Sequence, residues 1–294
     1  MTLDSQHKAR RGANSDGPLL RAVTSIPALG YLLVFMAIPL LLIISYAFLT
    51  AGRFGGVKPP LTFENITRLI QPIYRDVLFT SVLTAGAATL LAFALGFPAA
   101  LVISRLTPRW QTIALIAVVL PFWTNFLIRT YAWIVLLNRE GLINHGLALI
   151  GLGPIEVLYT RSAVILGLFY AYLPLMVLPI YASLQRLDPS LLEAARNLGA
   201  GGWRRFRTVL LPLTMPGILA GALFVFIPSL GNFVIPELLG GGKSQMIGNL
   251  IRDQFLKSRD WPFGSALSLM VLALLMVVLW AQARAARRTR EWAG

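Results

Sequence analysis

The stretch LDPSLLEAARNLG, residues 187–199, is typical of a short helix with a defined beginning and end. Asp188 can accept hydrogen bonds from the first free N–H groups, and Pro189 suits the first helical position, where no N–H is needed. Gly199 stands where the chain must leave the helix in a left-handed conformation. Leucines and alanines between these ends form an apolar stripe with polar side chains beside it. A connecting loop does not require such a helix, so we expect it to dock on a partner.

The chain around this stretch has the composition of an integral membrane protein. Of its 294 residues, 56% are hydrophobic and 13% are charged, and the mean hydropathy is +0.71. Soluble domains carry about 25% charged residues. The absence of Cys excludes disulfides, thiolate metal sites and Cys nucleophiles, and two His leave little for metal binding or general-base chemistry. We therefore expect no metal site, no cofactor and no catalytic residues in this chain.

Six apolar segments are long enough to cross a membrane, which requires about 20 residues for about 30 Å of hydrocarbon. Interior Pro and Gly in most of them are tolerated where neighbouring helices satisfy the backbone. Gly217 and Gly221 have the spacing of a close helix contact, and Ala85–Ala88 is a second run of small residues. The sequence thus predicts an all-α membrane protein with six transmembrane helices. The predicted spans are Ile26–Leu49, Leu78–Ser104, Thr112–Leu137, Ala163–Leu184, Val209–Leu230 and Phe263–Ala281.

The distribution of Lys and Arg predicts the orientation. If the N-terminus is inside, the inner segments hold about fifteen basic and about five acidic residues, whereas the outer loops hold about ten and about seven. We therefore expect both termini in the cytoplasm, on the same side as residues 188–199. The expected parts are a polar cytoplasmic leader at 1–22, a six-span transmembrane domain at 23–283 and a basic cytoplasmic tail at 284–294. The net charge of +14 then marks cytoplasmic segments and not a nucleic-acid surface.

A glycine-rich run that ends in Lys-Ser, Gly240–Ser244, raises the alternative that this chain binds ATP itself. A phosphate-binding loop needs G-x-x-x-x-G-K-[ST], because its backbone N–H groups surround the phosphates. Glu237 stands where the first Gly belongs, and its carboxylate would repel phosphate. The run also follows the fifth predicted span, which places it on the outer side, away from cytosolic ATP. We expect a turn at the outer mouth.

Residues within and after the opening stretch resemble the EAA signature of ABC importer permease subunits. The match consists of Glu193-Ala194-Ala195, Gly199 after three further residues, and Val209-x-Leu211-Pro212 after nine more, with Val209 in place of the usual Ile. The resemblance implies the type I ABC importer permease fold, with residues 188–199 as the helix that couples to a cytosolic ATPase. ATP would then be hydrolysed by that partner chain. The expected coupling residues are Asp188, Glu193, Ala194, Ala195, Gly199, Leu211 and Pro212.

The alternative for this segment is an amphipathic helix that lies on the lipid headgroups. Three arginines that follow it, Arg204, Arg205 and Arg207, would favour that position. The complete signature favours docking on an ATPase.

Other stretches resemble the permeases of spermidine/putrescine importers. Leu120–Trp133 resembles their third span, and Phe226–Ser244, continuing through Met246–Ile251, resembles their fifth span and the loop after it. The resemblance covers most of the chain from residue 75 onward and is greatest to the first of the two permease subunits. It implies a bacterial inner-membrane complex with a second homologous permease, two ATP-binding subunits and a periplasmic substrate-binding protein. Relatives with the same stretches carry opines or aminophosphonates, which stay open as alternative substrates.

A polyamine path requires carboxylates and aromatic faces. Glu237, near the outer end of the fifth span, is the nearest carboxylate, whereas Arg129 and Lys243 would repel a cation. Asn125 and Asn232 are costly in hydrocarbon unless they face the bundle interior. Each aromatic residue can instead belong to an interface belt or to packing, Glu237 can be a solvated loop carboxylate, and Arg129 can extend to the outer headgroups. The expected path residues are Trp123, Asn125, Tyr131, Tyr170, Tyr172, Phe226, Asn232, Phe233, Glu237 and Lys243.

Two other classes of function remain as alternatives. A stand-alone channel or secondary transporter would need ionisable residues within the spans for ion coupling, and these are largely missing. A membrane enzyme that uses ATP would need a complete phosphate loop and acid/base residues on the cytosolic side, and neither is found in the sequence.

Overall fold

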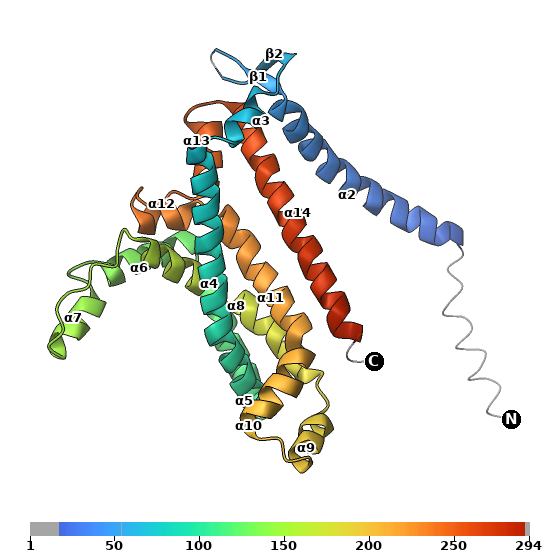
Figure 1. The fold of residues 1–294 in the computed structure, drawn as a ribbon, viewed down its shortest axis with the longest axis vertical. Helices are drawn as coiled ribbons and strands as arrows, with labels where there is room; N and C mark the ends of the chain where they lie inside the picture. The colour runs from blue at the N-terminus through green and yellow to red at the C-terminus, as the bar shows by residue number, and fades with distance from the viewer. Residues whose placement is uncertain (1–17, 54, 292–294) are drawn as a thin grey trace.

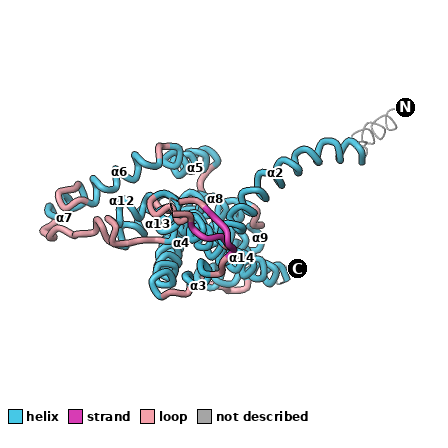
Figure 2. The backbone as a smooth tube through the Cα atoms, turned by 90° about the horizontal axis from the view of Figure 1, so that it is seen from above, coloured by secondary structure: helices cyan, strands magenta, loops and turns pink. Residues whose placement is uncertain are grey.

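A computed structural model describes residues 18–53 and 55–291, which are helical over most of their length (Figure 1). Three long helices form the central bundle: α4 (Pro72–Arg105), α8 (Arg161–Gln185) and α11 (Leu211–Gly231). Helix α14 (Trp261–Glu291) lies beside α11 and contacts α2 (Pro18–Ala47). Figure 2 shows that α2 leaves the bundle on the side opposite to α6 and α7. Of the predicted leader, residues 1–17 lie outside the described residues, as do residues 292–294 of the predicted tail.

The core of the bundle lies where α4, α8 and α11 meet. Met176 and Val177 of α8 and Val225 of α11 are fully buried there. The backbones approach closely: a Cβ atom at Gly217 would meet the carbonyl oxygen of Pro179, and one at Gly221 would lie 2.9 Å from Met176 Sδ. The predicted contact through small residues is therefore confirmed for α11. In the second run, Ala85 and Ala88 are fully buried, whereas Gly86 faces open space.

The third predicted span is bent. The segment predicted as one span over Thr112–Leu137 consists of two helices, α5 (Pro108–Trp123) and α6 (Phe126–Leu137), and the bend between α5 and residues 126–149 is 93°. Thr124 is extended between them, with φ −72° and ψ 155°. By length and composition the described residues contain five helices that can cross a membrane, or six if the bent pair is one span. Helix α7 (Leu142–Leu149) continues this arm away from the bundle.

Short elements cover one end of the bundle. An antiparallel hairpin, β1 (Leu49–Ala51) and β2 (Val57–Leu61), is followed by α3 (Glu64–Leu69). The buried amide of Asn65 donates hydrogen bonds to the carbonyl oxygens of Ala47 and Leu49, at 3.1 and 2.9 Å, which fixes α3 to the end of α2.

The remaining short helices lie at both ends of α11. Before it come α9 (Pro189–Asn197), α10 (Gly202–Arg205) and a π-helical turn, η2 (Phe206–Leu210). After it come α12 (Val234–Gly240) and α13 (Ile247–Leu256). Figure 1 places α9 and α10 at the end of the bundle opposite to α13 and the hairpin.

Candidate functional site

Helix α9 is closed at both ends by local hydrogen bonds. Asp188 Oδ1 accepts from the N–H of Ser190 at 2.9 Å. Because the charged carboxylate accepts this bond, the pKa of Asp188 lies below its ordinary value. Gly199 has φ +77°, and its N–H donates to the carbonyl oxygen of Arg196 at 2.9 Å. The helix and both of the ends predicted from the sequence are confirmed.

The exposed surface of α9 is partly apolar. Leu192 packs against the core cluster, but Leu191 is 45% exposed and Leu198 is 88% exposed. Glu193 is exposed between them. Beside α9 a hollow of 310 Å³ opens between α8 and α11; it is lined by Ser183, Arg186, Leu187, Asp188, Leu191, Leu213 and Pro216. A protruding helix with exposed leucines next to a hollow has the form of a docking element.

The link from α9 into the bundle runs through the π-helical turn. The N–H of Leu211 donates to the carbonyl oxygen of Phe206, five residues back, and Pro212 follows with no N–H to continue the ladder. The ring of Phe206 stacks on Trp203 at 5.3 Å and meets Phe97 of α4 edge-on at 5.6 Å. Leu211 packs on the same core cluster. The predicted coupling residues thus lie on one continuous path from α9 to α11.

Two buried asparagines organise the break between α11 and α12. Asn232 Nδ2 donates to the hydroxyl of Tyr172 at 2.9 Å, and its Oδ1 accepts from the N–H of Ile235 at 2.8 Å. Asn249 of α13 is only 2% exposed, and its Nδ2 donates to the carbonyl oxygen of Phe233 at 2.8 Å. These bonds hold the chain after Gly231 in a fixed turn, because a buried polar group left without a partner is costly.

A cluster of charges joins α12 to α13. Arg252 Nη2 lies 3.0 Å from Glu237 Oε2 and 2.6 Å from Asp253 Oδ1, and Lys257 Nζ lies 3.1 Å from Asp253 Oδ2. Partial burial tends to raise the pKa of Asp253, but the hydrogen bonds and charges of Arg252 and Lys257 outweigh it and hold that pKa below its usual value. The Arg252 guanidinium carbon also lies 5.4 Å from the centre of the Phe233 ring.

Arg252 is not among the residues predicted from the sequence, because only the folding of α12 against α13 brings it to Glu237. Of the predicted path residues, Tyr172, Asn232, Phe233 and Glu237 lie along one chain of contacts. The role of a substrate path for these residues stays a prediction.

Arg129 bridges the bend of the third span. Its Nη1 donates to the carbonyl oxygen of Pro121 at 2.7 Å, and its guanidinium carbon lies 5.7 Å from the centre of the Tyr170 ring. Tyr170 in turn meets Trp133 edge-on at 5.4 Å. Asn125 Oδ1 accepts from the N–H groups of Leu127 and Ile128 and thus caps α6. The polar side chains of this segment therefore form hydrogen bonds with backbone N–H and carbonyl groups on both sides of the bend.

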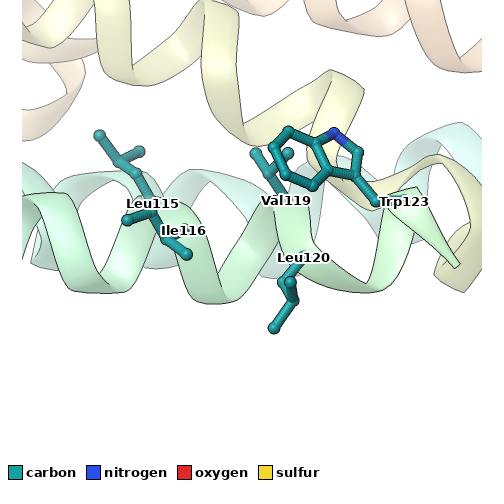
Figure 3. Close-up of a pocket in the computed structure, with 5 residues that line it drawn as sticks. All are labelled: Leu115, Ile116, Val119, Leu120 and Trp123. Carbon is teal, nitrogen blue, oxygen red and sulfur yellow. The ribbon is translucent and has the colours of Figure 1, made fainter.

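The other predicted aromatic residues lie apart from Asn232. Trp123 is 80% exposed at the end of α5, beside a wholly apolar hollow that it lines with Leu115, Ile116, Val119 and Leu120 (Figure 3). Tyr131 is exposed on α6, and Phe226 packs in the cluster around Leu230 and Phe263. This hollow has no polar side chain to orient a ligand.

The glycine-rich run ends a helix and does not open one. Gly241 has φ +58° at the end of α12, and the N–H of Lys243 donates to the carbonyl oxygen of Gly240 at 3.1 Å. The N–H of Tyr159, just before α8, donates to Leu239, so the run lies at the end of α8 opposite to α9. A phosphate loop precedes a helix N-terminus, whose N–H groups face the phosphate, whereas here α13 begins only at Ile247. Within residues 18–53 and 55–291, no group of three His, Cys, Asp or Glu could hold a metal ion.

Comparison with known proteins gives relatives over most of the chain. The chain is 44% identical over 257 residues to the spermidine/putrescine transport system permease protein PotB of Haemophilus influenzae, covering 87% of this chain and 90% of that protein. It is 43% identical to PotB of Escherichia coli over 264 residues, covering 88% and 96%. The molybdenum transport system permease protein ModB of Mycobacterium bovis is 29% identical over 216 residues, covering 72% and 79%.

Solved structures show the same fold. A bacterial ABC transporter for import of the acidic polysaccharide alginate matches with a TM-score of 0.72 at 19% identity, covering 95% of this chain and 99% of that one. The MetNI methionine ABC transporter matches with a TM-score of 0.55 at 16% identity, covering 75% and 99%. The fold is that of type I ABC importer permeases.

Residues 87–291 match the family described as binding-protein-dependent transport system inner membrane component. The match extends over more than half of the chain and includes α9, the π-helical turn and the cluster between α12 and α13. The chain therefore belongs to this family of multi-pass inner-membrane proteins, the permease subunits of ABC importers.

Proposed function

We propose that this chain is one of two permease subunits of a bacterial polyamine importer and that α9 couples it to a cytosolic ATPase. The observation that carries the coupling is the form of α9, a helix closed at Asp188 and Gly199 with Leu191 and Leu198 exposed on its surface. The partners are a second homologous permease, two ATP-binding subunits and a periplasmic substrate-binding protein.

The orientation follows from charge. The segments that the predicted topology places on the same side as residues 188–199 carry about fifteen basic and about five acidic residues, which is the bias of cytoplasmic loops. In this orientation both termini and α9 face the cytoplasm, and the β1–β2 hairpin, α3 and α13 face the binding protein. The end of α14 lies toward the α9 side in Figure 1, in agreement with this arrangement.

Helix α11 provides the connection from ATPase to path. Closure of the ATPases displaces α9, and the rigid packing of Phe206 between Trp203 and Phe97 passes the displacement to α11. Close contact with α8 at Gly217 and Gly221 keeps α11 and α8 moving together. The far end of α11, at Gly231, adjoins the chain of contacts from Tyr172 to Glu237, so tilting α11 rearranges that end and alternates access.

Polyamine is the substrate that the relatives and the residues favour together. Two relatives more than 40% identical are named as spermidine/putrescine permeases. The contact chain offers a carboxylate at Glu237 and aromatic faces at Phe233 and Tyr172, which suit a flexible polycation. The other residues predicted for the path, Trp123, Asn125, Tyr131, Tyr170, Phe226 and Lys243, are not part of this contact chain. An opine or aminophosphonate is the alternative cargo.

The test is uptake by the chain assembled with its second permease, ATPase and binding protein. Glu193→Ala and Glu193→Arg should abolish uptake of labelled putrescine while membrane insertion stays normal. Glu156→Ala, which alters an exposed carboxylate far from α9, is the control and should leave uptake unchanged. Normal uptake by Glu193→Arg would refute the coupling. ATP hydrolysis stimulated by binding protein loaded with an opine, and not with a polyamine, would refute the cargo and keep the importer.

A further inference from the structure

The guanidinium of Arg252 occupies surroundings that suit a bound cation. Its Nη2 lies 3.0 Å from Glu237 Oε2, and its central carbon lies 5.4 Å from the centre of the Phe233 ring. A carboxylate and an aromatic face are the two groups that bind ammonium and guanidinium ligands. The chain thus supplies its own cation to this position.

The carboxylate is also held by Asn249, through the same oxygen that bonds to Arg252. Asn249 is almost fully buried, and its Nδ2 donates to Glu237 Oε2 at 3.1 Å as well as to the carbonyl oxygen of Phe233. Asn249 therefore links the Glu237 carboxylate to the backbone of Phe233. The Glu237 side chain is 46% exposed, and among the residues that the structure describes its Oε1 has no hydrogen-bond partner. One face of the carboxylate is accordingly open to a ligand.

The pairing of Arg252 is asymmetric. Two of its nitrogens, Nε and Nη2, donate to Asp253 Oδ1 at 2.8 and 2.6 Å, whereas only Nη2 reaches Glu237. Arg252 can leave Glu237 and keep a charged partner. Within the described part of the chain, Glu237 has Arg252 as its sole salt-bridge partner and would be left with an unbalanced charge unless another cation replaced it.

We propose that Glu237 and Phe233 form a binding site for a substrate ammonium group and that Arg252 is a tethered competitor. In the absence of substrate, the Arg252 guanidinium pairs with Glu237. When a substrate cation takes its place, Arg252 keeps only its bonds to Asp253. The inference rests on the proposed polyamine function for the identity of that cation. Competition by a tethered charge keeps the affinity low, so the cargo can leave again, as a transport path requires.

The test is ligand binding to the assembled complex in nanodiscs, without binding protein or nucleotide. Putrescine is titrated while thermal unfolding is followed, and binding is read as the half-saturating concentration for the rise in unfolding temperature. The uncharged isostere 1,4-butanediol and NaCl at equal ionic strength are the ligand controls. Glu237→Gln should remove the stabilisation by putrescine.

Removal of the competitor should strengthen binding. Arg252→Gln should lower the half-saturating concentration about fivefold, which corresponds to about 1 kcal/mol for an ion pair of this exposure. Arg252→Lys retains a tethered cation and should bind like the wild type. Arg139→Gln is the matched control, because it also leaves one carboxylate, Glu156, without its cation and lies in a different pair; it should have no effect.

A second variant covers the case in which Arg252→Gln does not assemble. Asp253→Asn deprives Arg252 of its other partner and should raise the half-saturating concentration. Equal loss of binding in Arg252→Gln and Glu237→Gln, or no change in Arg252→Gln or Asp253→Asn, would overturn the proposal. Uptake by the same complexes is a separate readout: a complex that shows this binding pattern but imports no polyamine would refute the proposed function and leave the cation site standing.

Discussion

The contact between α8 and α11 should fail when a single methyl group is added at Gly217. A Cβ atom there would overlap the carbonyl oxygen of Pro179 and the side chain of Ser183. A backbone carbonyl cannot move aside alone, so α8 and α11 would have to separate. Gly86 of α4 is the matched position, because a Cβ atom there meets nothing within 4 Å.

The magnitude follows from the comparison of the two glycines. Replacing Gly by Ala within a helix stabilises it by about 0.5–1 kcal/mol when the space is open. Both variants gain this term, so it cancels in their difference. Overpacking in a close contact costs about 1–3 kcal/mol, and we expect Gly217→Ala to be less stable than Gly86→Ala by that amount. At about 2–4 °C per kcal/mol, the difference in unfolding temperature is readily measured.

The assay is thermal unfolding of the chain in nanodiscs, followed by a signal from the whole bundle. Substrate-stimulated ATP hydrolysis of the assembled complex is measured in parallel, because separation of α8 from α11 should also weaken coupling. Equal unfolding temperatures for Gly217→Ala and Gly86→Ala would refute the close contact. A lower unfolding temperature for Gly217→Ala than for Gly86→Ala, together with unchanged substrate-stimulated ATP hydrolysis, would refute the role of α11 in transmission. The close contact between α8 and α11 would then still stand.

Three further predictions concern charges and caps. Asp188→Ala should loosen the first turn of α9 and reduce substrate-stimulated ATP hydrolysis, whereas Asp188→Ser should retain it. Lys243→Ala should leave ATP hydrolysis by the complex intact; ATP hydrolysis by the purified chain alone that this variant abolishes would contradict our assignment. The pKa of Asp253 is lowered in the folded chain, so its stabilising effect is present above about pH 4 and is lost as the pH falls further through that pKa. Asp253→Asn should lack this loss of thermal stability in acid.

The helix at residues 188–199 could be predicted from the sequence because its signals are local. A cap at Asp188, a proline at the first turn and a glycine at the end act within a few residues of the positions they determine. The contact at Gly217 and Gly221 was predictable for a similar reason, because the spacing of small residues on one helix reports the approach of another backbone. In both cases one element carries all the information.

The cluster between α12 and α13 could not be predicted from the sequence in the same way. Glu237 and Arg252 are fifteen residues apart and lie on different short helices. Their contact depends on the turn that follows Gly231 and on the buried amide of Asn249, which bonds to both α12 and the residue before it. No periodicity or motif in the sequence records such a convergence, so Glu237 was identified as a carboxylate near the path without its partner.

The bent third span shows why polar residues in an apolar run were interpreted incompletely. Burial of an amide in hydrocarbon is costly unless its hydrogen bonds are satisfied, and this favoured Asn125 and Asn232 as path residues. The same cost is met when the amide satisfies the free N–H groups of a helix that begins there, as Asn125 does for α6. Asn232 meets the cost with both ends of its amide: its Oδ1 accepts a hydrogen bond at the start of α12, and its Nδ2 donates one to Tyr172. A polar residue within an apolar run therefore predicts a break in the helix as directly as it predicts a path.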